Sequence, residues 1–273
     1  MRGDTYYLVT CPIDFYARVR VQIMDDATGI VAPADCPKTR AAVAATLTYL
    51  ARADRSVRVS VSNPMPRGKG LGSSSADVAA AIAATGLALG RTLTPAEIGR
   101  LALGVEPTDG VMFPGIALFD HREGRAMEEL GPPPPVEIVA LDFGGVVDTL
   151  EFNQTDRRAL WQSLQPQTDA ALDLVRQGVQ QGDPALLGQG ATISARANQQ
   201  VLFKPELDRV LEFAQAVGAV GVNVAHSGTF IGVLLDARQR RGKSTHRQAR
   251  AAFPSAESVQ HFRLLGGGVQ RVP

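Results

Sequence analysis

The chain has 273 residues, of which 45% are hydrophobic, and a formal net charge of +1. This length supports two modest domains with cores of their own, and the near-neutral charge excludes a strong electrostatic pull toward nucleic acid or an acidic surface. No apolar run approaches the length of a membrane span, the N-terminus lacks the pattern of a signal peptide, and the two cysteines, Cys11 and Cys36, lack metal-ligand spacing. We therefore expect a cytoplasmic globular protein with structural thiols and with neither a membrane nor a nucleic-acid partner.

The predicted strands fall into two halves of the chain, which indicates an α+β protein with a mixed sheet in each half. Between the halves, the four prolines at 132–135 exclude a helix or a central strand and form a stiff spacer. We place the domain boundary there and expect an N-terminal domain over 1–130 and a C-terminal domain over 136–273. Alternating or continuous apolar character predicts strands at 6–9, 16–24, 57–61, 116–120, 125–130, 136–142, 220–224, 230–235 and 259–265.

The predicted helices combine apolar residues at helical spacing with start and stop signals. The clearest start is Thr94, which forms a capping box with Glu97 and is followed by Pro95 at the first helical position. Gly104 is expected to end this helix. Helices are expected at 39–53, 77–89, 95–103, 155–164, 168–181, 184–198, 205–217 and 243–252.

The segment 66–76, Pro-Arg-Gly-Lys-Gly-Leu-Gly-Ser-Ser-Ser-Ala, is the most informative stretch of the chain. It follows the predicted strand 57–61 and precedes the apolar helix 77–89. Glycines let the backbone come close to a ligand, and the first N–H groups of a helix point outward, so this order predicts an anion-binding site. One of the serines at 73–75 is expected to cap the helix, while another hydroxyl faces a metal or a phosphate.

Several interpretations of this loop compete. A P-loop requires Lys followed by Ser or Thr after its last glycine, whereas Lys69 precedes Gly70. The stretch 70–75 imitates the dinucleotide fingerprint with serine last, but 78–96 lacks the acidic residue that would hold a ribose. A flexible turn before a buried helix is the interpretation without a ligand.

Phosphoryl transfer from ATP requires cradled phosphates, a divalent ion, an oriented hydroxyl and a carboxylate that accepts its proton. Glu106 and Asp109 lie three residues apart in a proline-containing turn, so one could hold Mg²⁺ and the other serve as the base. Their alternative is a solvated acidic turn. The turn 226–228 lies between two apolar strands, and His226 could contact the substrate or be hydrogen-bonded within the fold.

The pattern Pro-x-x-x-Gly-Leu-Gly-Ser-Ser-x-Ala between a strand and an apolar helix resembles the ATP-phosphate loop of the GHMP kinases, named after the galacto-, homoserine, mevalonate and phosphomevalonate kinases. Further segments in a characteristic order make the chain similar to the L-threonine kinase branch, which serves cobalamin synthesis, over essentially its whole length. These segments are 11–16, 106–109, 118–121, the tetraproline at 132–135 and 223–228.

The resemblance implies a two-domain GHMP kinase fold, with a ribosomal-protein-S5-like N-terminal domain and a ferredoxin-like C-terminal domain. It implies ATP- and Mg²⁺-dependent phosphorylation of the threonine hydroxyl to O-phospho-L-threonine. By position, Asp109 matches the catalytic aspartate, and Ser74 and Glu106 match the magnesium ligands. The implied contacts to the ATP phosphates come from Pro66, Lys69, Gly70, Leu71, Gly72, Ser73, Ser74, Ser75 and Ala76. The third family motif, near phosphates and substrate, corresponds to His226, Ser227 and Gly228.

The chain departs from the family pattern at its start. The threonine kinases open with a strand that carries Gly-Glu-Leu-x-Gln-Gly, and this chain begins with Met-Arg-Gly-Asp at 1–4, where that motif should end. A misassigned start codon, a truncated chain and a true absence of the strand are the open explanations. A true absence predicts an unpaired edge of the first sheet and an incomplete substrate pocket.

Two further functions stay open beside L-threonine kinase. Acceptor specificity depends on side-chain placement in a pocket, so a GHMP kinase for another small alcohol, such as homoserine, is the alternative among enzymes. A catalytically silent nucleotide-binding sensor is the alternative outside enzymes. Retention of both Glu106 and Asp109 argues against the sensor. The sequence predicts no oligomeric state.

Overall fold

The computed structural model describes residues 5–25, 29–145 and 157–272. The chain divides into two compact units that are not contiguous in sequence. The C-terminal unit consists mainly of Leu130–Gly266 and includes Pro66–Leu71 of the glycine-serine loop. The N-terminal unit consists of Tyr6–Met65, Gly72–Glu129 and the last residues of the chain. The chain therefore passes from one unit to the other within the loop.

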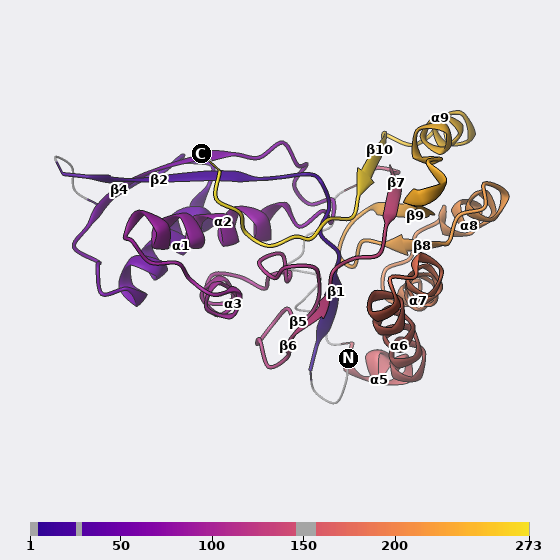
Figure 1. Cartoon of the computed structure of the whole chain (residues 1–273), viewed down its shortest axis with the longest axis horizontal. Helices are drawn as coiled ribbons and strands as arrows, with labels where there is room; N and C mark the ends of the chain where they lie inside the picture. The colour runs from indigo at the N-terminus through magenta and orange to yellow at the C-terminus, as the bar shows by residue number, and fades with distance from the viewer. Residues whose placement is uncertain (1–4, 26–28, 146–156, 273) are drawn as a thin grey trace. The chain divides into compact units, whose positions relative to one another are not determined.

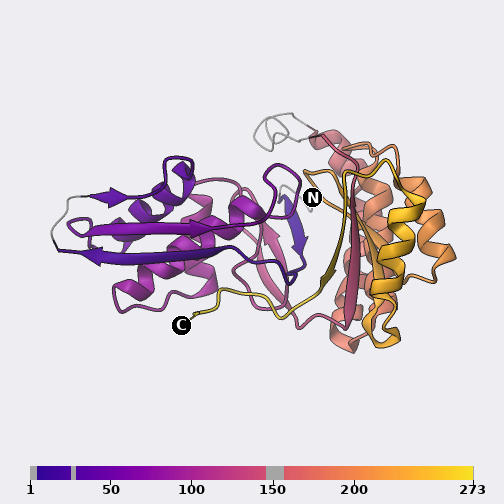
Figure 2. The same cartoon turned by 90° about the horizontal axis from the view of Figure 1, so that it is seen from above.

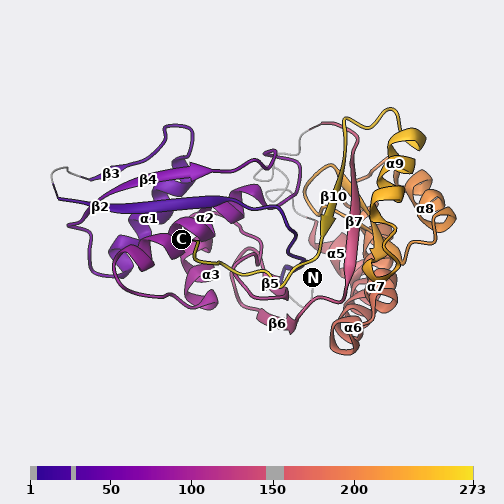
Figure 3. The same ribbon diagram turned by 45° about the horizontal axis from the view of Figure 1, so that its top comes forward.

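The N-terminal unit contains two three-stranded sheets among its described residues. In the first, β4 (Ser56–Ser62) lies between β2 (Arg18–Met24), which is antiparallel to it, and β3 (Ile30–Val31), which is parallel to it (Figure 3). In the second, β5 (Ile116–Asp120) lies between β1 (Tyr7–Thr10) and β6 (Met127–Gly131). β1 runs antiparallel to β5 with Tyr7 opposite Asp120.

Three helices complete this unit: α1 (Pro37–Tyr49), α2 (Ser73–Ala88) and α3 (Pro95–Leu103). α1 and α2 lie on one face of the β2–β4 sheet (Figure 1). α2 carries alanines, Val78 and Ile82 on buried positions, and these pack with Val57 and Phe119 into one hydrophobic core. The core fixes α2, and with it the serines of its first turn.

The ends of two helices test the capping predictions. α3 has the predicted capping box between Thr94 and Glu97, and it ends at Gly104 as predicted. The prediction that a serine caps α2 is wrong: the cap residue is Gly72, in the left-handed region, and no side chain caps the helix. A left-handed turn just before the helix favours glycine, so the serines move into the first helical turn.

The C-terminal unit is built on one antiparallel sheet with strand order β10-β7-β9-β8. Helices α6, α7, α8 and α9 lie on one face of it (Figure 2). Its strands are β7 (Val136–Asp142), β8 (Gly221–Val224), β9 (Phe230–Asp236) and β10 (Ser258–Arg263). Its helical elements are α5 (Arg158–Ser163), α6 (Gln165–Gln181), α7 (Pro184–Asn198), α8 (Leu207–Ala216), the 3₁₀ turn η1 (Ala237–Gln239) and α9 (Gly242–Ala252).

In chain order, the fourth strand of this sheet pairs with the first, and the third separates the first from the second. This is the split βαβ arrangement of ferredoxin-like folds, as expected. The expectation of a mixed sheet is wrong for this unit, because every strand pair in it is antiparallel. The sequence also missed β3 and η1, which are too short to show a period.

The remaining expectations concern the cysteines, a membrane span and two segments of the chain. Cys11 and Cys36 form no disulfide with each other, and Cys36 is buried. In the described ranges, no helix has both the length and the apolar character needed to cross a bilayer. The unusual start of the chain at 1–4 and the first residues of the helix expected at 155–164 lie outside the described residues.

Candidate active site

Three glycines of the loop 66–76, at 68, 70 and 72, have positive φ angles, and two of them also lie in tight contacts. Gly70 and Gly72 have φ angles of 88° and 70°, in the left-handed region that disfavours side chains. A Cβ on Gly70 would lie 2.4 Å from the Cβ of Ala225 and 2.9 Å from the Cα of Gly228. A Cβ on Gly72 would lie 3.2 Å from Oδ2 of Asp109. The backbone angle favours glycine at both positions, and at Gly70 the lack of space excludes a side chain as well.

The serines at 73–75 occupy the first turn of α2, where successive side chains point in different directions. Ser73 is buried and accepts a hydrogen bond from Nδ2 of Asn63 at 3.1 Å. Ser74 donates its hydroxyl to Oε1 of Glu106. Ser75 donates to Oδ2 of Asp109 at 3.3 Å. One serine is thus structural, and the other two each meet one of the predicted acidic residues.

The start of α2 has the geometry of an anion site. The N–H of Ala76 makes the first i→i−4 hydrogen bond of the helix, to the carbonyl of Gly72 at 2.9 Å. The N–H groups at 73–75 therefore precede the helical ladder, and the positive end of the helix dipole lies there. Such an end binds phosphate well.

Asp109 is held from two sides by Ser75. Its carboxylate accepts from the hydroxyl of Ser75, and its own N–H donates to the same oxygen at 3.0 Å. Burial raises the pKa of Asp109, the hydrogen bond from Ser75 opposes this, and the charge of Glu106 raises it further. A carboxylate with a raised pKa and a fixed orientation is a good proton acceptor.

Glu106 has two partners. Besides Ser74, it forms an ion pair with the ammonium of Lys38, whose side chain is 47% exposed. A carboxylate and a hydroxyl side by side would provide hard oxygen ligands of the kind that Mg²⁺ prefers when it is carried by a nucleotide. The described residues contain no cluster of three or more His, Cys, Asp or Glu side chains that could hold a metal alone. The pair thus fits Mg²⁺ carried with a nucleotide.

The other half of the loop lies in the C-terminal unit. The carbonyl of Lys69 accepts from the N–H of Thr229 at 3.0 Å, and its ammonium lies 2.8 Å from Asp142. The ring of His226 stacks on Trp161, with centroids 5.6 Å apart. Gly228 approaches Gly70 so closely that a side chain at either position would collide with the other segment.

The buried side chain of Lys204 binds the backbone of the turn 226–228. Its ammonium donates to the carbonyl of Gly228 at 2.7 Å, and the residue is only 6% exposed. The side chain of Gln199 binds both the N–H and the carbonyl of Lys204. Burial lowers the pKa of Lys204 to about 8.

The predicted residues therefore form two groups. Ser74, Ser75, Glu106 and Asp109 meet in the N-terminal unit, whereas the stretch 69–70 meets the turn 226–228 in the C-terminal unit.

The models of the GHMP kinases N-terminal domain and of the GHMP kinases C-terminal domain match residues 39–114 and 174–254. The L-threonine kinase of Salmonella typhimurium strain LT2 is 30% identical to the chain over 272 residues, which cover 96% of the chain and 88% of the relative. The chain is a GHMP kinase.

The chain is also similar to other GHMP kinases. The L-threonine kinase of Citrobacter freundii is 29% identical, with 96% of this chain and 91% of the relative covered. The solved L. major mevalonate kinase has a TM-score of 0.74 at 16% identity, covering 97% of this chain and 91% of its own. The solved homoserine kinase of Cytophaga hutchinsonii has a TM-score of 0.70 at 16% identity, and the match covers 98% of this chain and 97% of the homoserine kinase chain. The predicted two-domain GHMP kinase fold is confirmed.

Membership of the GHMP kinases makes the chain a phosphotransferase with an alcohol group as acceptor, in a family that uses ATP as donor. Several residues around its loop escaped the sequence analysis: Asn63, Lys38, Asp142, Lys204 and Thr229. Asp142 could have been noticed as an acidic residue that ends an apolar strand. Lys38 lies 68 positions from its partner Glu106 and gives no local signal.

Proposed function

We propose that the chain is an L-threonine kinase that converts ATP and L-threonine into ADP and O-phospho-L-threonine, for use in cobalamin (corrinoid) synthesis. The names of the two curated relatives support the acceptor, since both match 96% of the chain. The observation that carries the chemistry is the pairing of two loop serines with two carboxylates, Ser74 with Glu106 and Ser75 with Asp109. The proposal includes a cytoplasmic location, where ATP is available and thiols stay reduced.

The proposed roles follow from these contacts. The loop binds the triphosphate through its backbone and through the N-terminus of α2. Ser74 and Glu106 hold Mg²⁺, which when bound neutralises charge on the phosphate oxygens. The turn 226–228 borders phosphates and substrate, with His226 as the proposed substrate contact. The residues proposed for the phosphates are Pro66, Lys69 (through its backbone), Gly70, Leu71, Gly72, Ser73, Ser74, Ser75 and Ala76.

Asp109 is the proposed base. The threonine oxygen forms a bond to the γ-phosphorus, the bond to the β–γ bridging oxygen breaks, and ADP leaves. The proton of the threonine hydroxyl passes to the carboxylate of Asp109. Its raised pKa gives the carboxylate more affinity for this proton than an exposed aspartate has. Ser75 binds both the carboxylate and the backbone N–H of Asp109 and thus limits the orientations that the carboxylate can adopt.

The test is ADP production with Mg·ATP and L-threonine, compared with L-homoserine at equal concentration. We expect a higher kcat/KM for L-threonine. A preference for homoserine would contradict the proposed acceptor, and nucleotide binding without ADP production from either compound would favour a silent sensor. The likeness to a homoserine kinase makes L-homoserine the appropriate competitor.

Asp109→Asn tests the base. It keeps the shape of the side chain and removes the proton acceptor, so kcat should fall about 10²- to 10⁴-fold while the Kd of Mg·ATP changes by less than about twofold. Asp54→Asn is the matched control, because Asp54 is exposed. Near-normal turnover of Asp109→Asn would show that another group accepts the proton.

A further inference from the structure

The ammonium of Lys69, in the middle of the glycine-serine loop, is held by two carboxylates. It lies 2.8 Å from Oδ2 of Asp142 and 3.0 Å from Oε2 of Glu257. The Asp142 side chain is 5% exposed and that of Glu257 60% exposed, so the two partners differ in strength. An exposed ion pair contributes little, whereas a buried one resists separation. The bond to Asp142 is therefore the one that restrains Lys69.

Asp142 is the centre of a small network at the end of β7. Its Oδ1 accepts from the hydroxyl of Thr229 at 2.7 Å and from the N–H of Gly144 at 3.1 Å. Burial alone would raise the pKa of Asp142, but the bonds from Lys69, Thr229 and Gly144 lower it overall. The carboxylate is thus kept ionised by three donors, which fix its position.

This network reaches the loop backbone by two routes. The side chain of Lys69 binds Asp142, and the carbonyl of Lys69 accepts from the N–H of Thr229 at 3.0 Å. Thr229 directly follows Gly228, whose backbone packs against Gly70. Asp142 therefore restrains both sides of the contact between the loop and the turn 226–228.

We propose that Asp142 is a positioning residue for nucleotide binding, which acts through the ammonium of Lys69 and the hydroxyl of Thr229 to hold residues 69–70 in the conformation that binds the triphosphate. In this arrangement Lys69 anchors the loop, and the phosphates are bound by the backbone of the loop and the start of α2. A direct ammonium–phosphate contact would instead require Lys69 to leave a buried carboxylate, at the cost of an unpaired buried charge.

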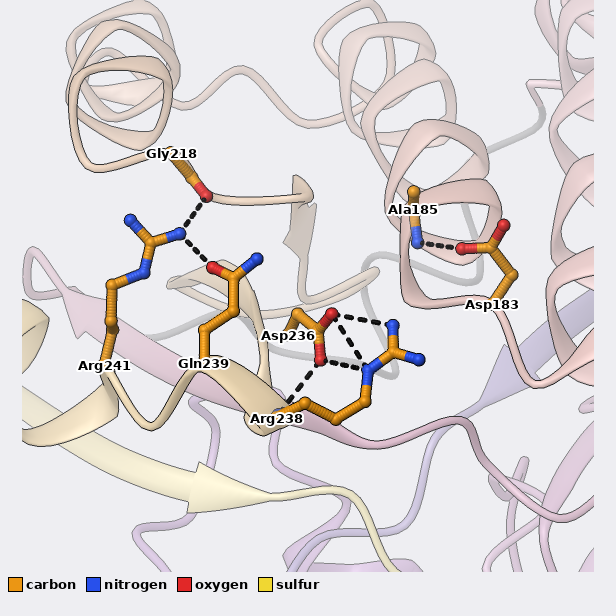
Figure 4. Close-up of polar contacts among 7 residues, drawn as sticks. All are labelled: Asp183, Ala185, Gly218, Asp236, Arg238, Gln239 and Arg241. Carbon is orange, nitrogen blue, oxygen red and sulfur yellow. Dashed lines mark hydrogen bonds and ion pairs between the residues drawn. The ribbon is translucent and has the colours of Figure 1, made fainter.

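The opposite end of the same sheet supplies a matched control. Asp236 accepts hydrogen bonds from the guanidinium and N–H of Arg238, and this pair lies beside Arg241, which binds the carbonyl of Gly218 (Figure 4). In the β7–β9 ladder Asp236 pairs with Val136, whereas Asp142 pairs with Phe230 next to Thr229. Asp236→Asn removes the charge of a carboxylate that is 11% exposed from the same unit and changes no contact of the loop.

The experiment measures the Kd of Mg·ADP by calorimetry for the wild type, Asp142→Asn, Lys69→Met, the double variant and Asp236→Asn. We expect Asp142→Asn and Lys69→Met each to raise the Kd of Mg·ADP roughly tenfold, the usual effect of losing a charged hydrogen bond. The Kd of the double variant should exceed the Kd of each single variant by no more than about twofold, because both changes break the bond between Lys69 and Asp142. Asp236→Asn should bind as the wild type does.

The sign of the Asp142→Asn effect decides between the two roles of Lys69. If Lys69 contacts phosphate directly, freeing it from Asp142 strengthens binding or leaves it unchanged, and only Lys69→Met weakens it; that result overturns the inference. Additive losses in the double variant overturn it too. At saturating nucleotide, Asp142→Asn should keep a kcat near that of the wild type, and a collapse of kcat with unchanged Kd would also refute the positioning role.

Thr229→Val provides a second route if Asp142→Asn fails to fold. It removes only the hydroxyl bond to Asp142 and retains the backbone bond to Lys69, so a several-fold weaker Kd is expected, and an unchanged Kd contradicts the inference. The inference rests on the proposed use of ATP. Failure of the wild type to bind Mg·ADP would refute that proposal, whereas wild-type binding with unaffected variants would refute only the role of Asp142.

Discussion

Gly70→Ala gives the sharpest test of the loop geometry. At φ 88° an alanine costs about 1–2 kcal/mol from the left-handed backbone alone. Its Cβ would also lie 2.4 Å from the Cβ of Ala225, about 1 Å inside normal contact distance. Overpacking of this kind adds about 1–3 kcal/mol. If the loop escapes by moving away from the turn 226–228, the steric part of this cost appears as lost nucleotide affinity, a factor of about 5 to 150.

Gly182→Ala separates the steric cost from the backbone cost. Gly182 also has a positive φ, 64°, and lies in the same unit as Gly70, but a Cβ there would meet nothing within 4 Å. Calorimetric titration with Mg·ADP, accompanied by melting curves, should show similar backbone destabilisation in both variants and a weaker Kd only for Gly70→Ala. Equal Kd values for the two variants would refute the claim that close packing against Gly228 shapes the phosphate site.

Three further predictions concern single polar groups. Ser74→Ala removes the hydroxyl beside Glu106 and should raise the KM for Mg·ATP by about tenfold in steady-state assays with saturating L-threonine; an unchanged KM would remove Ser74 from the proposed metal site. Lys38→Met frees Glu106 from a competing ammonium, so the Mg²⁺ concentration for half-maximal activity should fall, and a rise would contradict the competition. The pKa of Lys204 drops from 10.5 to about 8 on folding, so its buried charge costs stability below about pH 8 and this cost disappears as the pH rises toward 10.5. The melting temperature of Lys204→Met relative to the wild type should therefore decline from about pH 7 to about pH 10, and a constant difference would show that Lys204 is not buried as a cation.

Local signals predicted most of the secondary structure. Thr94 and Glu97 specify a helix start within four residues, and the capping box forms as predicted because every contact in it is local. The apolar run of β7 has the predicted bounds of 136–142, since a strand buried on both faces needs no partner information to be recognised. Serine capping of α2 failed because the same residue types also serve inside a helical turn when their hydroxyls meet carboxylates from another segment.

The sequence predicted the site residues that lie in short motifs. It did not predict the ion pairs between residues that are far apart in the sequence. Glu106 and Asp109 are close in sequence, and both meet adjacent serines of the loop. The pairing of Lys69 with Glu257 spans 188 positions and depends on β10 and β7 being neighbours in the sheet. Sequence alone therefore assigned Lys69 to the phosphates by its place in the motif, without information on the carboxylates that hold its ammonium.

Gly70 and Gly72, two of the three glycines of the loop, are constrained for different physical reasons. Gly70 is limited by the backbone of the turn 226–228, so a side chain there would be opposed by atoms that can move only with the turn. Gly72 is limited by Oδ2 of Asp109 at 3.2 Å, an atom at the end of a side chain that Ser75 also binds. A methyl group at Gly72 would thus disturb the proposed base before it disturbs the fold. Gly72→Ala should accordingly reduce kcat more than nucleotide affinity, the reverse of Gly70→Ala, and a common effect of both variants on Kd alone would show that Asp109 does not depend on this contact.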